Sequence, residues 1–297
     1  MTEAQAFDGW MRTVQQDMEE VLASYLPRAT QVPGRLHDAM RYATLDGGKR
    51  VRPLLVFAAG ELFNADRAAL ARAATAVEMI HAYSLVHDDM PCMDDDALRR
   101  GKPTVHVKYD EATALLVGDA LQAQAFLVLS DIAGEPSLIL KMIRVLATAA
   151  GSVGMCGGQA IDLDSVGMRL SLDELEQMHC LKTGALLRAS VLLGALSGKA
   201  LTESEQSALD VYADAIGLAF QVVDDVLDAT ADSNTLGKTA GKDAADNKPT
   251  YVSILGLEQS RALAEKLRHD AHQAIMPFGD RARRLRELAD LIVERKT

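Results

Sequence analysis

An apolar helical run leads directly into a cluster of carboxylates, and this junction constrains the chain more than any other feature. The run covers residues 73–86, and the carboxylates follow at Asp88, Asp89, Asp94, Asp95 and Asp96. Negative charges this close in sequence repel one another unless a cation lies among them. Mg²⁺ binds one or two carboxylates and keeps positions for substrate phosphates, so the junction predicts a metal site at the end of a helix.

Three cations come after these carboxylates and suggest what the metal site binds. They are Arg99, Arg100 and Lys102. Guanidinium and ammonium groups bind phosphate oxygens through charge-assisted hydrogen bonds. We therefore expect the metal and these cations to meet the same phosphate from different sides.

The composition favours an all-α fold. A chain of 297 residues could form one large domain or two small ones, and we predict a single domain over residues 1–297. Hydrophobic residues make up 48% of the chain and aromatic residues 4%, while Gly and Pro are few for a loop-rich β protein. Apolar residues recur at helical spacing over most of the sequence. The predicted helices cover residues 3–25, 35–44, 54–63, 67–90, 111–131, 137–159, 171–196, 203–229, 250–275 and 279–295.

Charge and cysteine content narrow the function classes. The net charge of −11 argues against general binding to nucleic acids or anionic membranes. Cys92, Cys156 and Cys180 are odd in number and widely spaced, which indicates a reducing compartment without a disulfide framework. No signal-peptide pattern and no uncharged run of membrane-spanning length is visible. These features predict a soluble, cytoplasmic protein.

A second basic segment precedes the acidic cluster. The sequence DGGKRVRP at 46–53 places Lys49, Arg50 and Arg52 at the start of an apolar helix. The glycine pair allows a tight turn, and the free N–H groups of a helix N-terminus favour anions. The segment is either a phosphate-binding corner or a solvated basic loop, and the acidic cluster downstream favours the first.

The long helix before the carboxylates carries further candidates. His81, Ser84 and Asp88 share one face of it. His81 is either a hydrogen-bonded core residue or faces the ligand of the acidic cluster. Pro91 should end the helix, so that the chain beyond can fold Asp94 back towards Asp88.

A second acidic cluster lies within the predicted helix 203–229. Gln221, Asp224, Asp225 and Asp228 share one helical face, and the residues between them are apolar. Carboxylates stacked within two turns destabilise a helix through like-charge repulsion. Metal ligation is therefore favoured over a solvated stripe.

Two further segments place lysines where a charged ligand could bind. Lys182 and Thr183 interrupt an apolar helix, and a buried lysine either pairs with an acid or faces a ligand. The polar segment 230–249 contains Lys238 and Lys248, and it predicts a mobile lid, with a disordered linker as the alternative. Together with the acidic clusters, these residues indicate a metal-dependent enzyme acting on a hydrophobic diphosphate.

These motifs resemble those of the trans-isoprenyl diphosphate synthases, in particular the bacterial and plastid-type farnesyl and geranyl diphosphate synthases. The resemblance covers nearly the whole chain, most clearly residues 35–255. It rests on GGKRVRP (47–53), HAYSLVHDDMPCMDDD and RRGKPT (within 81–104), GGQAIDL (157–163), LKTGAL (181–186), FQVVDDVLD (220–228) and the GK to KPTY segment (237–251). It implies a bundle of about ten or more helices around a deep central cavity, usually as a homodimer.

The resemblance also implies roles for individual residues. The implied metal ligands are Asp88, Asp94 and Asp224, supported by Asp89, Asp225 and Asp228. Isopentenyl diphosphate would be bound by Lys49, Arg52, His81 and Arg100. The allylic diphosphate would be held by Arg99, Lys182, Thr183, Gln221, Lys238 and Lys248. The implied catalytic set is Asp88, Asp94, Arg99, Lys182, Asp224 and Lys238.

The implied reaction is a head-to-tail condensation of isopentenyl diphosphate with dimethylallyl or geranyl diphosphate. About three Mg²⁺ ions would bridge the departing diphosphate, the isopentenyl double bond would attack the resulting carbocation, and a proton would be lost. No side-chain nucleophile is required, in agreement with the lack of a Ser-His-Asp or Cys-His pattern.

Product length in this family is associated with the residues just before the first acidic motif. Tyr83 lies five positions before Asp88, about 7.5 Å along the helix axis. A bulky aromatic side chain there resembles the floor that stops elongation, and the small Ser84 beside it leaves some room. We expect farnesyl diphosphate (C15), with geranyl (C10) and geranylgeranyl (C20) diphosphate as alternatives.

Other function classes account for fewer of these features. A terpene cyclase shares the fold and the first motif, but its second motif usually mixes Asn, Ser and Glu. A non-catalytic synthase subunit would lack the acidic motifs. A Ca²⁺-binding or scaffold protein would explain the carboxylates but not the ordered cations.

Overall fold

The computed structural model describes residues 3–230 and 249–295, and these residues are predominantly helical. The predictions of an all-α fold and of ten or more helices are confirmed. The chain forms two compact units, which we call the N-terminal unit (residues 1–144 and 193–199) and the C-terminal unit (residues 145–192 and 200–297).

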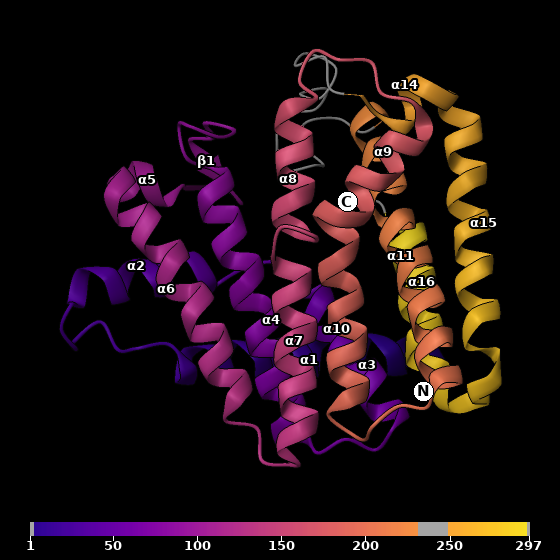
Figure 1. The fold of residues 1–297 in the computed structure, drawn as a ribbon, viewed down its shortest axis with the longest axis horizontal. Helices are drawn as coiled ribbons and strands as arrows, with labels where there is room; N and C mark the ends of the chain where they lie inside the picture. The colour runs from indigo at the N-terminus through magenta and orange to yellow at the C-terminus, as the bar shows by residue number, and fades with distance from the viewer. Residues whose placement is uncertain (1–2, 231–248, 296–297) are drawn as a thin grey trace. The chain divides into compact units, whose positions relative to one another are not determined.

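The N-terminal unit is built around α4, which packs along α6 and also contacts α1 and α3 (Figure 1). Its helix α3 is buried over most of its surface, in keeping with its apolar sequence. The elements of this unit are α1 (Glu3–Tyr25), α2 (Gly34–Thr44), α3 (Val51–Leu62), α4 (Arg67–Asp88), β1 (Leu98–Arg99), β2 (Lys102–Pro103), α5 (Val105–Lys108), α6 (Glu111–Ser130), the first part of α7 (Pro136–Ala150) and the end of α10 (Ala185–Leu196).

The C-terminal unit is organised around α11, which packs along α15 and against α16 (Figure 1). Tyr212 is fully buried on α11, and its hydroxyl donates to the Leu285 carbonyl on α16 at 2.7 Å. The elements are the end of α7, α8 (Met155–Asp164), α9 (Leu172–His179), a π-helical turn (Cys180–Gly184), most of α10, α11 (Glu203–Thr230), α14 (Tyr251–Leu255), α15 (Leu257–Ile275), a 3₁₀ segment (Met276–Ala282) and α16 (Arg283–Glu294).

Two helices predicted as continuous are divided, and those predictions were wrong. The predicted helix 137–159 breaks between α7 and α8, where a Cβ on Gly154 would lie only 2.3 Å from the Ala149 carbonyl oxygen. The predicted helix 250–275 breaks at Gly256, whose φ of 83° is left-handed and ends α14. At both places the absence of a side chain permits the break.

The β1–β2 hairpin was not predicted. Its register pairs Arg99 with Lys102, and its two turn residues, Arg100 and Gly101, both have positive φ. Two left-handed turn residues are typical of tight hairpins. The hairpin carries Arg99 and Arg100, and it therefore determines where these two cations lie.

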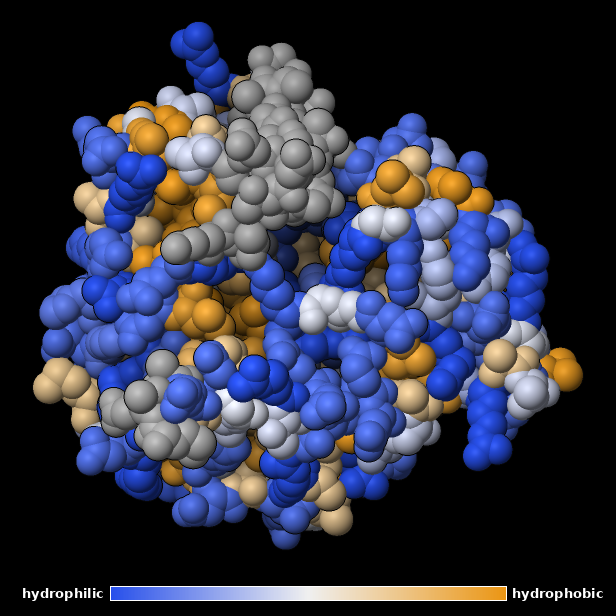
Figure 2. Space-filling model, turned by 180° about the vertical axis from the view of Figure 1, so that it is seen from behind, coloured by the Kyte–Doolittle hydropathy of each residue, from blue (hydrophilic) through white to orange (hydrophobic). Residues whose placement is uncertain are grey.

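Some apolar side chains remain exposed. In the view of Figure 2, hydrophilic residues cover most of the surface, and hydrophobic residues form separate patches. Residues 111–130 and 136–164 satisfy a length and hydropathy criterion for membrane spans, which core helices of soluble proteins also satisfy. The second stretch is divided between α7 and α8. On α6, Leu116 and Leu127 are more than half exposed.

Candidate active site

The first acidic motif lies at the C-terminal end of α4, on a turn that reverses the chain. α4 ends at Asp88, and the Asp94 N–H donates to the Asp88 carbonyl at 2.8 Å. This confirms the prediction that the chain beyond Pro91 folds Asp94 back towards Asp88. The turn thus places the two carboxylate-bearing residues together on one reversal of the backbone.

The donor chemistry of this turn suits Mg²⁺. The oxygens of Asp88 and Asp94 are hard ligands, and both residues are partly exposed. Among the described residues, no group of three or more His, Cys, Asp or Glu side chains forms a complete metal cage. Mg²⁺ usually needs only one or two carboxylates because water and substrate phosphates supply the remaining ligands. The residues present therefore fit this ion.

Asp89, the second carboxylate of the motif, holds an arginine. Arg99 Nε donates to both Asp89 carboxylate oxygens at 2.8 and 2.9 Å, and Arg99 Nη2 donates to Oδ1 at 2.6 Å. Asp89 is buried, and this burial raises the pKa of its carboxyl against the opposing effect of Arg99. The fork fixes the guanidinium of Arg99 next to the turn that carries Asp88 and Asp94.

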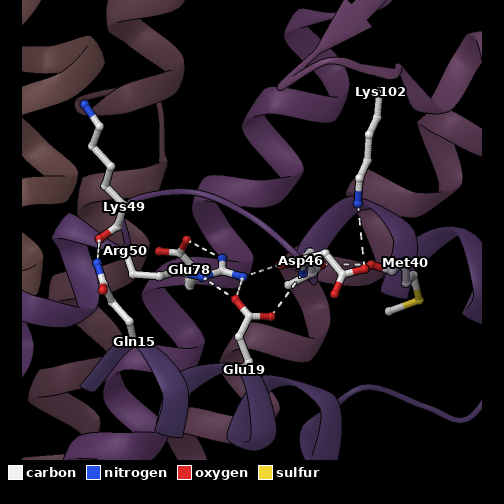
Figure 3. Close-up of polar contacts among 9 residues, drawn as sticks. Gln15, Glu19, Met40, Asp46, Lys49, Arg50, Glu78 and Lys102 are labelled. Atoms are coloured by element: carbon white, nitrogen blue, oxygen red, sulfur yellow. Dashed lines mark hydrogen bonds and ion pairs between the residues drawn. The ribbon is translucent and has the colours of Figure 1, made fainter. Parts of the chain in front are cut away.

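The basic segment 46–53 divides into exposed and buried cations. Lys49 is exposed and Arg52 is partly exposed. Arg50 is buried and forms ion pairs with Glu78 at 2.7 Å and Glu19 at 2.5 Å (Figure 3). The sequence suggested that Lys49, Arg50 and Arg52 could all bind a phosphate. For Arg50 this was wrong, because Glu19 and Glu78 already hold its guanidinium inside the protein.

Several arginines surround His81 on α4. Burial lowers the pKa of His81 far below its ordinary value, and the positive charges of Arg52, Arg100, Arg99 and Arg50 lower it further. The imidazole is thus neutral near pH 7 and can donate one N–H. A neutral donor amid fixed cations is an arrangement that suits a phosphate.

The glycine pair of the basic segment makes room for Arg100. A Cβ on Gly47 would lie 2.8 Å from Arg100 Nη1, and a Cβ on Gly48 would lie 2.8 Å from Nη2. Gly48 also has a φ of 87°. Arg100 therefore lies directly against the turn that carries Lys49. Beside this turn, a pocket that opens to solvent has both cationic and apolar walls, lined among others by Arg99, Arg100, Lys102, Leu45 and Leu85.

The second acidic motif lies on α11 in the C-terminal unit. Gln221 and Asp224 are partly exposed, whereas Asp225 and Asp228 are buried. Asp225 Oδ2 accepts a hydrogen bond from the Tyr251 N–H at 2.7 Å. Asp225 therefore anchors the start of α14, and Asp224 is the carboxylate of this motif with the more exposed side chain.

Asp224 has a partner that the sequence analysis missed. Arg295 Nη2 donates to Asp224 Oδ1 at 2.6 Å and to the Phe220 carbonyl at 2.7 Å, and its guanidinium lies 3.9 Å from the Phe220 ring centroid. Burial lowers the pKa of Arg295, and Asp224 opposes this shift. Arg295 belongs to no motif, and no sequence signal linked it to Asp224.

Lys182 also has a carboxylate partner. It lies on the π-helical turn after α9, and its Nζ is 2.5 Å from Asp162 Oδ2 on α8. The two backbones are in close contact, since a Cβ on Gly158 would lie 2.1 Å from the Lys182 nitrogen. Thr183 follows on the same turn and is partly exposed. Asp162 lies in the GGQAIDL motif, which was the available signal for it.

The remaining predicted residues fall into two groups. Tyr83 is buried on α4 and makes an edge contact with His87, their ring centroids 5.8 Å apart. Ser84 donates to the His81 carbonyl at 2.9 Å. Lys238 and Lys248, with most of the segment predicted as a lid, lie outside the described residues.

The family model of the polyprenyl synthetases matches residues 33–276. The chain is 51% identical to a farnesyl diphosphate synthase of Escherichia coli, over 87% of this chain and 88% of that protein. It is 48% identical to geranylgeranyl pyrophosphate synthase 11 (chloroplastic) of Arabidopsis thaliana, over 89% of this chain and 75% of that protein.

Solved structures resemble the chain over nearly its full length. An FPP/GFPP synthase from Zymomonas mobilis has a TM-score of 0.88 at 44% identity, covering 98% of this chain and 99% of that one. A geranyltransferase from Helicobacter pylori, complexed with magnesium and isoprenyl diphosphate, has a TM-score of 0.83 at 33% identity, covering 96% of this chain and 95% of that one.

Proposed function

We propose a specific reaction for this chain on the premise that it belongs to the polyprenyl synthetase family. It is a prenyltransferase that condenses isopentenyl diphosphate head-to-tail with dimethylallyl or geranyl diphosphate. The main product is farnesyl diphosphate, in line with the E. coli relative. The observation that carries the proposal is the grouping of Arg52, Arg99 and Arg100 around the neutral His81.

In the N-terminal unit, isopentenyl diphosphate is proposed to bind at Lys49, Arg52, His81 and Arg100. Lys49, Arg52 and Arg100 neutralise its charge, and His81 donates one hydrogen bond. Because the His81 pKa is strongly lowered, its hydrogen bond does not depend on protonation near neutral pH. No side chain needs to act as a nucleophile, since the isopentenyl double bond supplies the electrons for the new bond.

Mg²⁺ is the proposed cofactor, with Asp88 and Asp94 as its ligands in the N-terminal unit. Bound Mg²⁺ would neutralise the diphosphate as it leaves the allylic carbon, and we propose about three ions. Arg99, fixed by Asp89, is positioned to hold an oxygen of the same leaving group. Water must be kept from the carbocation, a role suited to apolar walls.

In the C-terminal unit, the proposed Mg²⁺ ligand is Asp224, with Asp225 and Asp228 in support. Lys182, Thr183 and Gln221 are proposed to bind the allylic diphosphate. Lys238 and Lys248 keep the same proposed role, although they lie outside the described residues. We also retain the proposals of one synthase domain, with residues 230–249 as a lid, and of a cytoplasmic location.

A homodimer is the proposed assembly. On α6, Leu115, Leu116 and Leu127 are 49%, 53% and 59% exposed, and Leu140 on α7 is 66% exposed. All four side chains belong to the N-terminal unit, and they lie on two helices, α6 and α7, that follow each other in the chain. A second copy of the chain would remove this apolar surface from water.

The experiment that tests the proposed reaction is a product assay with Mg²⁺, isopentenyl diphosphate and either dimethylallyl or geranyl diphosphate. We expect a C15 alcohol from both starters after dephosphorylation. Asp94→Asn should abolish turnover, while Asp95→Asn should not, because Asp95 has no proposed role and Asn also tolerates its left-handed φ of 50°. If geranyl diphosphate loses its diphosphate without consumption of isopentenyl diphosphate, the protein is a cyclase instead.

A further inference from the structure

The turn that carries Lys49 is held in an unfavourable backbone conformation. Asp46, Gly48 and Arg50 all have positive φ, of 58°, 87° and 53°. Glycine tolerates this conformation, but it is unfavourable for Asp46 and Arg50, whose side chains crowd the backbone there. Contacts from elsewhere in the protein must therefore stabilise the turn.

Those contacts come largely from one carboxylate on α1. Glu19 Oε2 accepts from the Asp46 N–H at 3.0 Å, and Glu19 Oε1 accepts from Arg50 Nε at 3.0 Å and Nη2 at 2.5 Å (Figure 3). A single side chain thus binds both non-glycine residues with positive φ. Arg50 Nη2 also donates to the Thr44 carbonyl at 2.8 Å, which closes the base of the turn.

A second side chain of α1 holds the lysine itself. Gln15 Nε2 donates to the Lys49 carbonyl at 2.8 Å (Figure 3). Gln15 and Glu19 are one helical turn apart on α1, so they present adjacent groups to the same segment. Between them they contact Asp46, Lys49 and Arg50.

Glu19 and Glu78 together hold the charge of the buried Arg50 guanidinium. Burial would lower the pKa of Arg50, but Glu78 and Glu19 outweigh this effect and raise it. Glu78 lies on α4 and is itself buried, and it occupies Nη1 of Arg50, whereas Glu19 occupies Nε and Nη2. The guanidinium therefore joins α1, α4 and the turn that carries Lys49.

We infer that Glu19 and Gln15 are positioning residues for the isopentenyl diphosphate site. This inference rests on the proposed function of Lys49, Arg52 and Arg100. Helix α1 precedes the segment matched by the family model, residues 33–276. Its role here is to fix the backbone on which Lys49 lies and against which Arg100 packs.

The test is a comparison of Michaelis constants for the two substrates. Glu19→Gln keeps the shape of the side chain but removes its charge, and Gln15→Ala removes only the bond to the Lys49 carbonyl. We expect KM for isopentenyl diphosphate to rise about ten-fold in Glu19→Gln and about three-fold in Gln15→Ala. We expect kcat and KM for geranyl diphosphate to stay within about two-fold, because a positioning role at one substrate site affects that substrate alone.

The matched control is Asp17→Asn on the same helix. Asp17 pairs with Arg67 at the start of α4, so its loss tests whether loosening α1 is sufficient. We expect wild-type constants for this variant. The inference is overturned if Asp17→Asn matches Glu19→Gln, or if KM for both substrates rises equally. Gln15→Ala provides the same test if Glu19→Gln does not fold. A wild-type protein that never consumes isopentenyl diphosphate would overturn the proposed function as well.

Discussion

Arg295 donates a hydrogen bond to Asp224 at 2.6 Å, so a cation near the C-terminus neutralises a carboxylate that we propose as a metal ligand. A guanidinium and a divalent cation compete for the same oxygen. The side chain of Asp224 is 40% exposed, so solvent screens the ion pair and its contribution is about 1 kcal/mol or less. Binding of Mg²⁺ through this oxygen of Asp224 would displace Arg295.

Replacing Arg295 by Met should increase the affinity for metal. We expect the Mg²⁺ concentration for half-maximal activity to fall about two- to five-fold, which corresponds to the free energy of the lost ion pair. Direct binding of Mn²⁺, followed by electron paramagnetic resonance, should tighten by the same factor. Arg268→Met is the control, because Arg268 pairs with Asp290 instead. A higher metal requirement in Arg295→Met would show that Arg295 supports the metal site.

Asp162→Asn should weaken binding of the allylic diphosphate. The Asp162 carboxylate lies 2.5 Å from Lys182 Nζ and orients it, and an amide provides neither the charge nor the same hydrogen bond. We expect KM for geranyl diphosphate to rise about five- to ten-fold, with KM for isopentenyl diphosphate unchanged. Asp164→Asn, two residues away on α8 and exposed, should have wild-type kinetics. An unchanged KM for geranyl diphosphate would exclude a positioning role for Asp162.

The sequence predicted those features of the site that depend on local rules. Pro91 cannot continue α4, and the reversal that brings Asp94 to Asp88 follows from this property. The helical face shared by Gln221, Asp224 and Asp228 follows from the helical period. Such features depend on residues close in the chain, where spacing and backbone chemistry are sufficient.

The sequence could not reveal which cations are buried. Arg50 and Arg52 are alike in chemistry and lie two residues apart, yet Arg50 is enclosed by Glu19 and Glu78 from two other helices. The pairing of Arg295 with Asp224 likewise joins residues far apart in the chain. Long-range ion pairs depend on how helices pack, and one sequence carries no periodic signal for them.

Tyr83→Ala should lengthen the product. Tyr83 is buried on α4 against His87, and loss of its ring opens space one turn before the acidic motif. We expect C20 alcohol to appear in the product assay at the expense of C15. Ser84→Ala is the control and should keep the wild-type products, because Ser84 is already small. An unchanged C15 product would show that another side chain forms the floor.

Charges on the exposed face of α6 should disrupt the proposed dimer. Leu116 and Leu127 are both more than half exposed, and a carboxylate there would be costly to bury against a second copy. We expect the double variant Leu116→Glu/Leu127→Glu to sediment as a monomer of about half the wild-type mass. Val211→Glu, at an exposed position on α11, should retain the wild-type mass. A monomeric wild-type protein would contradict the proposal directly.

Acid should destabilise the protein in part through His179. Burial lowers the pKa of His179 from 6.5 to about 4, with Asp162 raising it and Lys182 lowering it by smaller amounts. Between these two pKa values the unfolded chain binds a proton at His179 that the folded chain does not, so stability falls as the pH decreases from 6.5 towards 4. At pH 5 the loss of stability is about 2 kcal/mol, or a few degrees in melting temperature.

The variant His179→Phe keeps a ring beside Tyr251. Its melting temperature should therefore fall less than that of the wild type between pH 8 and pH 5. His269→Gln, at an exposed position on α15, should retain the wild-type loss. An equal loss in His179→Phe and the wild type would mean that His179 titrates alike in the folded and unfolded chains.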